Sequence, residues 1–178
     1  MRKSVIFILI VTMILMSAVS CTDYADKPHY ETIYYKENGI EIVLKNDMQR
    51  YDAEEFDFYF TNVLGTIVVT AFKLDAEFLA DNEIKSDVTA KEYVDILIKK
   101  NELDKDMIYY EENKKTGAYN FRYTYGLEDG STDVFYYVTV LGDAGNVWYV
   151  EMSCLNSDSE MYLPRFETWK NDLRTYKA

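Results

Sequence analysis

The sequence predicts an α+β protein, a three-layer α/β/α sandwich with a central, mostly antiparallel sheet. Three observations lead to this fold class. Strand-like segments are joined by short, glycine-containing loops, which connect antiparallel neighbours because a parallel connection needs a dozen residues or more. Two segments have the periodicity of amphipathic helices, and each needs a surface on which to bury its apolar stripe. Two strand segments are apolar on both faces, as expected for strands covered from both sides.

The first strands are predicted to form hairpins. Residues 32–36 and 40–44 flank the dipeptide Asn38-Gly39, which is typical of two-residue hairpin turns. In the next stretch, EFDFYFTN, phenylalanines alternate with polar residues, which predicts a strand with one buried face. The stretch GTIVVTAFKL follows a short turn and is apolar on both faces, so it is one of the two candidate central strands.

The hydrophobic period then changes to that of a helix. Thr89 lies three residues before Glu92, the spacing of a capping box, and apolar residues recur on one face, so we predict a helix over 89–101. A shorter helix is predicted near 76–82. The C-terminal segment is helical again, with Pro164 placed in its first turn. Its apolar stripe repeats at spacings of four and three and consists of Tyr162, Phe166, Trp169, Leu173 and Tyr176.

Four more strands are expected between the helix at 89–101 and the C-terminal helix. The separators NKKTG, GLEDG and GDAG are short, so the strands should be antiparallel neighbours. The stretch DVFYYVTVL is the second candidate central strand, because it is apolar on both faces. The predicted ranges are 107–112, 118–125, 132–141 and 146–155.

The N-terminus has the organisation of an export signal. Two basic residues, Arg2 and Lys3, precede an uncharged, mostly apolar run that ends in small residues before Cys21. The segment resembles a bacterial lipoprotein signal peptide, although Ala18 stands three positions before the cysteine, where leucine is usual. This resemblance implies that residues 1–20 are removed and that Cys21 receives acyl chains, which hold the protein at the cell membrane, facing outside the cytoplasm. Residues 21–31 are polar and read as a tether, so the folded domain spans 32–178.

The charge of the chain restricts its partners. From Cys21 onward there are 17 basic and 31 acidic residues, a formal charge of −14. Such a body repels phosphate backbones, so nucleic-acid binding is not expected. With Cys21 acylated, Cys154 would be the remaining thiol, and the fold would depend on its hydrophobic core instead of disulfides.

The residues needed for common catalytic sites are scarce. The only histidine, His29, lies in the predicted tether, where it cannot hold a nucleophile in place. Cys154 shares a face with Trp148 and Met152 and is expected to be a buried, unreactive core thiol. Zinc and haem sites lack ligands, so we expect no cofactor.

Two remaining features are candidates for binding. Glu128, Asp129 and Asp133 surround a turn and could hold a calcium ion weakly, although the same residues suit a tight hairpin turn. Tyrosines line one face of a single strand and could form an exposed platform for a ligand, although core packing is the favoured interpretation of this face. These candidate ligand-binding residues are Tyr119, Tyr123 and Tyr125.

The order of the predicted elements is similar to that of a known family. A hairpin with NGIEIVLKNDM is followed by paired strands with FDFYF and TIVVTAF, a helix with TAKEYVDIL and a strand meander. A strand with WYVEMSC then leads into a closing helix with RFETWKNDLRTYK. This pattern, over about 34–176, resembles the photosystem II extrinsic PsbP family and its bacterial lipoprotein relatives. The resemblance implies an α/β/α sandwich and a non-enzymatic accessory domain that docks on a membrane-bound partner. No functional residue is carried over.

The sequence therefore predicts a membrane-anchored lipoprotein that binds an envelope protein or an extracellular ligand and is not an enzyme. Two alternatives stay open at this point. One is a carboxylate-based enzyme acting on glycans, which would need paired acids in a cleft. The other is a structural envelope component that contacts its partner through an exposed aromatic patch.

Overall fold

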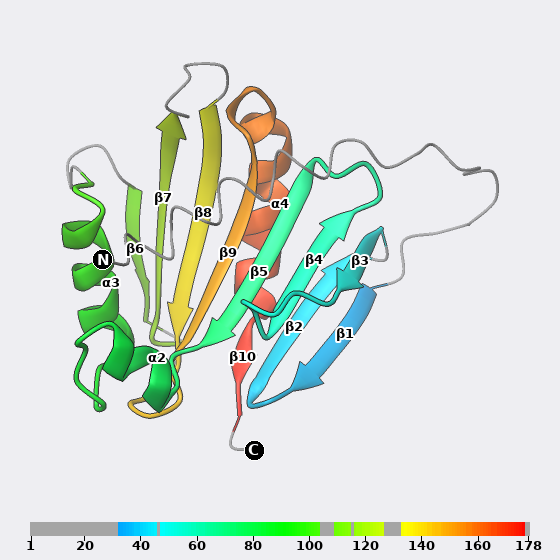
Figure 1. Cartoon of the computed structure of the whole chain (residues 1–178). Coiled ribbons are helices and arrows are strands. Elements are labelled where there is room, and N and C mark those ends of the chain that lie inside the picture. Colours follow the sequence, from blue (N-terminus) through cyan, green and yellow to red (C-terminus); the bar gives the residue numbers. More distant parts are fainter. Residues whose placement is uncertain (1–31, 46, 104–108, 115, 127–132, 177–178) are drawn as a thin grey trace.

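The computed structural model describes residues 32–45, 47–103, 109–114, 116–126 and 133–176. They form two antiparallel sheets and three α-helices (Figure 1). The first strands are β1 (Thr32–Glu37), β2 (Ile40–Lys45), β3 (Met48–Tyr51), β4 (Phe58–Asn62) and β5 (Ile67–Lys73). The others are β6 (Tyr109–Asn113), β7 (Ala118–Gly126), β8 (Asp133–Leu141), β9 (Trp148–Leu155) and β10 (Arg174–Thr175). The helices are α2 (Ala76–Asp81), α3 (Ala90–Lys100) and α4 (Ser159–Asp172), with a 3₁₀ turn η1 (Asn156–Asp158) before the last.

The large sheet has seven strands in the order β3-β4-β5-β9-β8-β7-β6 (Figure 1). Each neighbouring pair is antiparallel, as the short loops predicted. The two segments that are apolar on both faces became β5 and β8, and both lie inside the sheet. β9 lies between them and is buried along almost its whole length, because both of its faces are covered.

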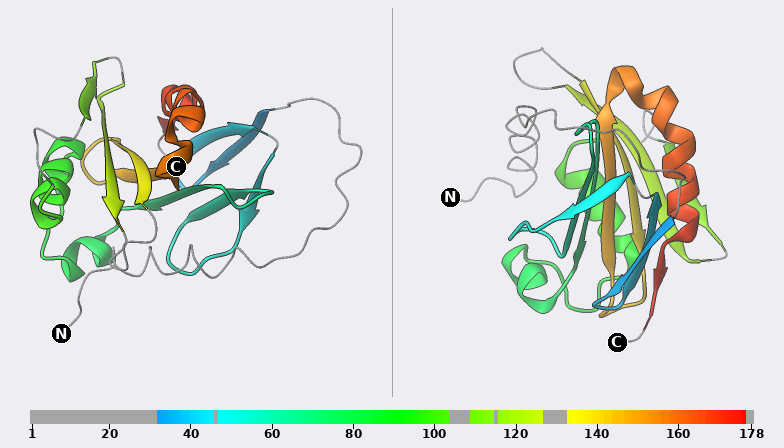
Figure 2. Two further views of the ribbon diagram at one scale, coloured as in Figure 1. Left: turned by 90° about the horizontal axis from the view of Figure 1, so that it is seen from above. Right: turned by 90° about the vertical axis from the view of Figure 1, so that its right-hand side faces the viewer.

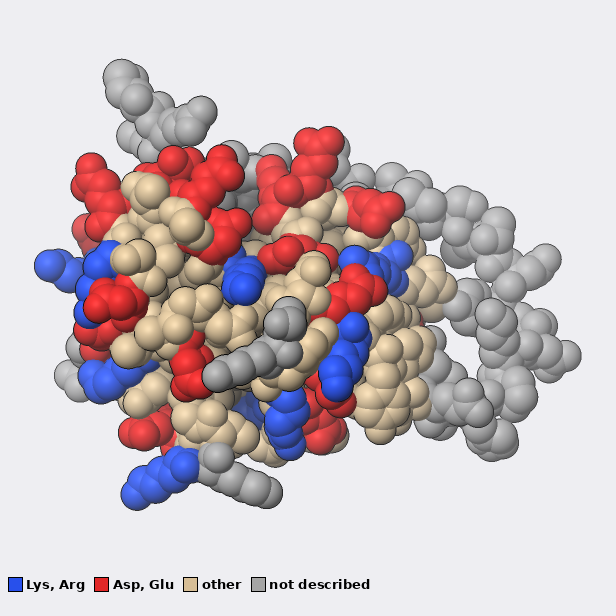
Figure 3. Space-filling model, turned by 90° about the horizontal axis from the view of Figure 1, so that it is seen from below, with Lys and Arg blue, Asp and Glu red and all other residues tan. Residues whose placement is uncertain are grey.

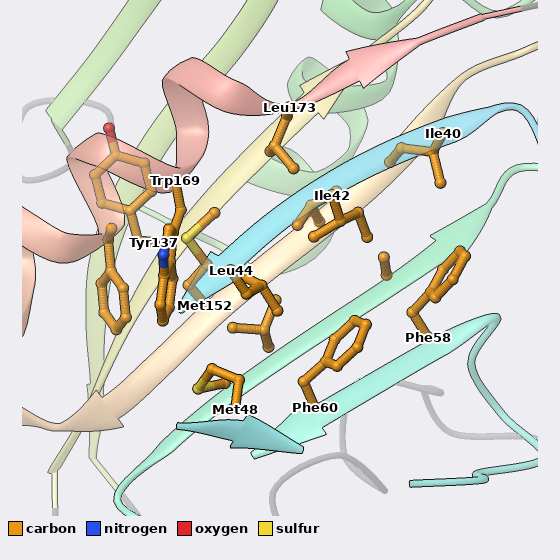
Figure 4. Packing of buried hydrophobic residues seen from close by; sticks show 14 of the residues in the cluster. Ile40, Ile42, Leu44, Met48, Phe58, Phe60, Tyr137, Met152, Trp169 and Leu173 are labelled. Atoms are coloured by element: carbon orange, nitrogen blue, oxygen red, sulfur yellow. The ribbon is translucent and has the colours of Figure 1, made fainter. Parts of the chain in front are cut away.

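The N-terminal hairpin does not join this sheet. β1 and β2 pair with each other, and β10 adds to the other side of β2 to make a separate three-stranded sheet. Ile40, Ile42 and Leu44 of β2 are fully buried, and they belong to the same core cluster as Phe58 and Phe60 of the large sheet (Figure 4). Complete burial of each such aliphatic side chain contributes about 1.5–3 kcal/mol, so the hairpin is held by its packing on the sheet face.

α4 covers the same face as this small sheet (Figure 2). Phe166 and Trp169 pack into the core cluster, as the apolar stripe predicted. The predicted end of the helix was wrong, because α4 stops at Asp172 and Leu173 adopts an extended backbone. The chain then forms β10, in which Arg174 pairs with Glu41, so backbone pairing with β2 replaces another helical turn.

The start of α4 also differs from the prediction. The 3₁₀ turn η1 comes directly after β9, so the helix begins at Ser159 and Pro164 lies inside it, beyond the first turn. Asp158 occupies the N-cap position but makes no side-chain capping bond. Instead, the Ser159 hydroxyl donates to the Asn156 carbonyl at 2.7 Å, which tightens the 3₁₀ turn.

The opposite face of the large sheet carries α2 and α3. The predicted capping box is present: the Thr89 hydroxyl accepts a bond from the Glu92 amide, and the Glu92 carboxylate accepts one from the Thr89 amide. Tyr93, Val94 and Leu97 of α3 pack in one cluster with residues of β7, β8 and β9. The shorter helix forms as α2, with Asp75 as its N-cap. Together with α4 on the other face, these helices complete the three-layer α/β/α sandwich.

Within the described residues, no helix is both long enough and apolar enough to cross a membrane.

Candidate functional site

The most unusual buried side chain of the large sheet is an acid. Glu151 lies in the middle of β9, where it pairs with Thr70 on one side and with Val138 on the other. Its exposed fraction is 5%, so the carboxyl group is largely removed from water. Since side chains alternate along a strand, Glu151 and Tyr149 lie on the same face, the one that carries α3. The Tyr149 hydroxyl donates a 2.5 Å hydrogen bond to Oε2 of Glu151.

Two more tyrosines complete the surroundings of this acid. The ring of Tyr123 on β7 stacks on that of Tyr136 on β8, with the centroids 5.0 Å apart and an interplanar angle of 15°. The negative charge of Glu151 contributes to raising the pKa of both hydroxyls, after burial, which is the larger cause. We define the Glu151 cluster as Thr70, Tyr123, Tyr136, Tyr149 and Glu151.

Burial dominates the electrostatics of the cluster. It raises the pKa of Glu151 to about 7, and the hydrogen bond from Tyr149 opposes part of this rise. Burial and the neighbouring carboxylate raise the pKa of Tyr149 well above its ordinary value, so this hydroxyl stays protonated and acts as a donor. The acid is therefore poised to change its charge near neutral pH, while the surrounding phenols keep their protons.

The cluster also contains an unsatisfied hydroxyl. Oγ1 of Thr70 is buried and has no hydrogen-bond partner in the part of the chain that the structure describes. Thr70 lies directly opposite Glu151 in the register of β5 and β9. A buried hydroxyl without a partner costs about 1–3 kcal/mol, so such groups are rare in folded proteins. A ligand atom that accepted or donated a hydrogen bond here would remove this cost.

The cluster lies at the boundary of the helix layer. α3 packs on β7 and β8, and Phe78 of α2 packs on Phe72 near the end of β5. Among the described elements, no helix covers β3 and β4 on this face (Figure 2). Tyr59 on β4 is half-buried, and its partner in register is Thr70. Glu151 thus lies between the apolar core under α3 and a part of the sheet with polar and aromatic side chains.

The three tyrosines singled out from the sequence have different surroundings. All three lie on the face of β7 that carries α3, together with the buried Phe121. Tyr123 enters the Glu151 cluster. Tyr119 packs against the core under α3, and its ring centroid is 6.0 Å from that of Tyr110. Tyr125 is 37% exposed near the end of the strand.

The calcium candidates are only partly described. Glu128 and Asp129 lie outside the described residues, whereas Asp133 is exposed at the start of β8. The described part of the chain contains no group of three or more histidine, cysteine or acidic side chains that could hold a metal ion. His29 and Cys21 also lie outside the described residues.

Cys154 is a core thiol, as its strand position predicted. Its exposed fraction is 2%, and burial, with a smaller contribution from Asp158, raises its pKa to about 12. A thiol with so high a pKa is protonated and is a poor nucleophile.

The structure contains a second polar cluster, on the α4 side of the sheet. Nζ of Lys170 lies 2.5 Å from a carboxylate oxygen of Glu111 and 2.6 Å from one of Glu167. The Tyr137 hydroxyl donates to the other oxygen of Glu167 at 3.0 Å. Because each charge in this cluster has a partner, we interpret it as a structural contact between α4 and the sheet.

Sequence reasoning missed Glu151 as a candidate functional residue. The prediction for WYVEMSC rested on the apolar face of that strand, which holds Trp148, Val150, Met152 and Cys154. The available signal was a single acid inside a strand that is otherwise free of charge and lies next to central strands. An acid at such a position is buried unless the sheet is open above it, and buried acids often mark functional sites.

Comparisons with known proteins show the fold. No protein-family model and no curated protein matches the chain. The solution structure of cyanobacterial PsbP (CyanoP) from Synechocystis sp. PCC 6803 is similar, with a TM-score of 0.54 and 10% identity over 89% of this chain and 99% of that one. The crystal structure of LpqN, involved in cell envelope biogenesis of Mycobacterium tuberculosis, gives a TM-score of 0.52 and 9% identity over 84% of this chain and 93% of that one. The chain therefore has a PsbP-like α/β/α fold, in agreement with the order of elements read from its sequence.

Proposed function

We propose that this chain is a lipid-anchored, extracytoplasmic binding protein whose ligand contacts the Glu151 cluster. Its acyl chains are attached to Cys21 after removal of residues 1–20, and residues 21–31 connect the anchor to the domain. The order of basic residues, apolar run and small residues before Cys21 supports the anchor. Two or three acyl chains give stable membrane attachment, whereas one chain alone gives only marginal binding.

The observation that carries the binding function is the pairing of Glu151 with Thr70. A nearly buried acid on a central strand lies opposite a hydroxyl that has no hydrogen-bond partner among the described residues. This arrangement does not stabilise the protein, since apolar side chains at the two positions would avoid the cost of burying polar groups. Both groups are instead suited to a ligand that supplies hydrogen-bond partners.

The chemistry of the cluster favours an organic cation, an amine or a quaternary ammonium group. A carboxylate offers the opposite charge, and the faces of tyrosine rings attract cations within about 6 Å of the ring centroid. The Glu151 cluster combines one carboxylate with three tyrosines, of which Tyr123 and Tyr136 present parallel rings. The formal charge of −14 from Cys21 onward also attracts cations toward the domain.

The structural neighbours support an accessory role in the cell envelope. CyanoP is a cyanobacterial PsbP, and LpqN is described as involved in cell envelope biogenesis. Neither is an argument for a particular partner of this chain, because their identity to it is low. They support a role for this domain in the cell envelope.

The glycan-enzyme alternative is less well supported by the geometry. Glycoside cleavage needs two carboxyl groups about 5–9.5 Å apart across a cleft. The register neighbours of Glu151 on its own face are Thr70, Val138, Tyr149 and Ser153, and none is an acid. A single acid with protonated phenols around it is better suited to hold a ligand than to cleave one.

The aromatic-patch alternative is not favoured by the positions of the exposed tyrosines. Tyr34, Tyr51, Tyr110 and Tyr125 are the most exposed aromatic side chains of the described residues. They lie on β1, β3, β6 and β7, and β3 and β6 are the two opposite edges of the large sheet. Scattered rings of this kind are normal on a protein surface and do not form one docking patch.

The anchor is tested by metabolic labelling in the native host with an alkyne analogue of palmitate. The full chain should incorporate the label into the membrane fraction, and Cys21→Ala should not. Cys154→Ala is the matched control and should label like the wild type. Label retained by Cys21→Ala would overturn the anchor.

The binding site is tested by thermal denaturation of residues 21–178 with added choline, spermidine and lysine. At least one of these cations should raise the Tm of the wild type and of Glu160→Gln, a control at an exposed acid of α4. Glu151→Gln should lose this ligand-induced shift, because the neutral amide keeps the shape but not the charge. Equal shifts in Glu151→Gln and wild type, or no shift with any of the three cations, would contradict the proposal.

A further inference from the structure

The turn between β4 and β5 exposes apolar side chains and is held in place by hydrogen bonds. Asn62 is buried, and its Oδ1 accepts hydrogen bonds from the amides of Thr66 at 2.8 Å and Ile67 at 3.0 Å. Its Nδ2 donates to Oγ1 of Thr66 at 2.8 Å, and the Gly65 amide closes the turn on the Asn62 carbonyl at 2.8 Å. One side chain thus fixes the whole turn.

The two residues at the tip of this turn are Val63 and Leu64. Their exposed fractions are 38% and 81%, so Leu64 is nearly as exposed as a side chain can be. Tight turns normally carry glycine, proline, asparagine, aspartate or serine, because those residues satisfy the backbone and interact with water. A rigid turn that displays valine and leucine instead indicates an apolar contact.

A third exposed apolar side chain lies in the first turn of α4, which adjoins the β4–β5 turn. The hydroxyls of Thr66 and Tyr162 are 3.0 Å apart, so the first turn of α4 adjoins the β4–β5 turn. Met161 precedes Tyr162 in that helical turn and is 68% exposed. We define the apolar tip as Val63, Leu64 and Met161.

The apolar tip lies on the side where the described chain begins. Thr32 pairs with Lys45, which is followed closely by β3, and Met48 of β3 pairs with Asn62 beneath the tip. At the opposite end of the domain, the Tyr176 amide donates a hydrogen bond to the Gly39 carbonyl. Seen from below, that end displays both acidic and basic side chains (Figure 3).

The connecting segment is short enough to bring this side of the domain to a bilayer. Ten residues, 22–31, separate Cys21 from Thr32 at the start of β1, which makes eleven Cα-to-Cα steps. Fully extended, they span at most about 36 Å, and a more compact tether brings the domain closer.

We propose that the apolar tip contacts the lipid bilayer and orients the anchored domain with its opposite, charged end away from the membrane. This inference rests on the anchor at Cys21 proposed above. Leu64 and Met161 enter the boundary between headgroups and acyl chains, where their apolar surface leaves water. The acidic body of the domain stays outside this boundary, because it is strongly hydrated and is repelled by anionic headgroups.

The orientation is tested by coupling Cys21 of residues 21–178 to a maleimide lipid in phosphatidylcholine vesicles. The buried Cys154, with its pKa of about 12, does not compete for the maleimide. Leu64→Trp places a fluorophore on the apolar tip, and Ala144→Trp places one in the exposed turn between β8 and β9. The buried Trp148 and Trp169 contribute the same background to both variants.

Lipids brominated on their acyl chains should quench the fluorescence of Leu64→Trp and leave that of Ala144→Trp unchanged. Equal quenching of the two, or quenching of Ala144→Trp alone, overturns the proposed orientation. Because the lipid is attached chemically, failure of this experiment is distinct from failure of Cys21 to be acylated in cells.

A second measurement uses Cys21→Ser in residues 21–178 and flotation with phosphatidylcholine vesicles. Leu64→Asp should lower the partition coefficient about tenfold, since it removes the burial of one leucine. Ala144→Asp adds the same charge at the other end and should have no such effect. Equal losses in the two variants would show that added charge, and not the apolar tip, determines binding.

Discussion

Tyr149 and Glu151 share one hydrogen bond in the interior of the sheet, with 2.5 Å between the hydroxyl and Oε2. Both side chains project from β9 toward the face that carries α3, and both are more than nine-tenths buried. The bond leaves the acid with one donor from within β9, while Thr70 opposite has none. Burial of the acid makes the stability of the domain depend on pH, and this hydrogen bond weakens that dependence.

Glu151→Gln should stabilise the domain above neutral pH. The pKa of Glu151 is about 7 in the folded state, against 4.5 as its ordinary value. The folded protein therefore binds this proton more tightly than the unfolded chain does. The resulting stability is complete below about pH 4.5 and is lost as the pH rises through 7. Full ionisation costs about 3 kcal/mol at one unit of pKa per 1.36 kcal/mol.

The measurement is urea denaturation of wild type and Glu151→Gln at pH 5 and pH 8. In Glu151→Gln, the unfolding free energies at pH 5 and pH 8 should differ much less than they do in the wild type. Glu160→Gln, at an exposed position, should keep the wild-type difference. An unchanged pH dependence in Glu151→Gln would show that the acid is not buried in solution.

Tyr149→Phe should make the same pH dependence stronger. The phenol donates to Glu151 and lowers the pKa of that acid, so its loss raises this pKa further. Leaving the buried carboxylate without its donor costs about 1–3 kcal/mol at pH 8. Tyr125→Phe, on the same face of β7 but exposed, is the matched control. A loss of equal size at pH 5 and pH 8 would point to packing instead of the hydrogen bond.

Lys170→Met should loosen the contact between α4 and the sheet. Burial alone would lower the pKa of Lys170, but its hydrogen bonds to Glu111, Glu167 and Tyr137 raise it, so the ammonium group stays charged. Removing it leaves two carboxylates without their partner. Because both are partly exposed, water recovers part of the loss, and we expect a cost of about 2 kcal/mol.

Urea denaturation at pH 7 measures this cost. Lys99→Met, in the exposed last turn of α3, should change the unfolding free energy little. An unchanged free energy of unfolding at pH 7 would mean that packing of the methionine stabilises this contact as much as the ion pairs do.

Cys154 should react with iodoacetamide only after unfolding. Its thiol is 2% exposed and its pKa is about 12, so both access and the thiolate form are lacking in the native state. The experiment uses residues 21–178 with Cys21→Ser, and mass spectrometry follows the modification with and without urea. Modification in native buffer at the rate of a free cysteine would contradict the buried position.

Particular patterns in the sequence were enough to predict most of the fold. The spacing of Thr89 and Glu92 predicted the start of α3, because a capping box is a local arrangement. The two stretches that are apolar on both faces predicted central strands, since only a covered strand buries both of its faces. The strand position of Cys154 predicted its burial for the same reason.

Other features depended on contacts between distant segments. The stripe that includes Tyr176 continues the helical period, yet the chain leaves the helix at Leu173 because pairing with β2 offers backbone hydrogen bonds instead. Nothing local to residues 32–45 shows that their hairpin joins β10 and not the large sheet. Pro164 lies deeper in α4 than predicted because the helix starts directly after η1.

By itself the sequence determined most of the secondary structure, the antiparallel connections and the layered fold class, because periodicity, caps and loop lengths act over a few residues. Only the tertiary structure decided that Glu151 lies beside Thr70, Tyr123 and Tyr136, and that the first turn of α4 adjoins the turn that carries Leu64. These neighbours come from strands and helices that are far apart in the chain. Their proximity is set by strand register and by packing across the sheet, which no local pattern encodes.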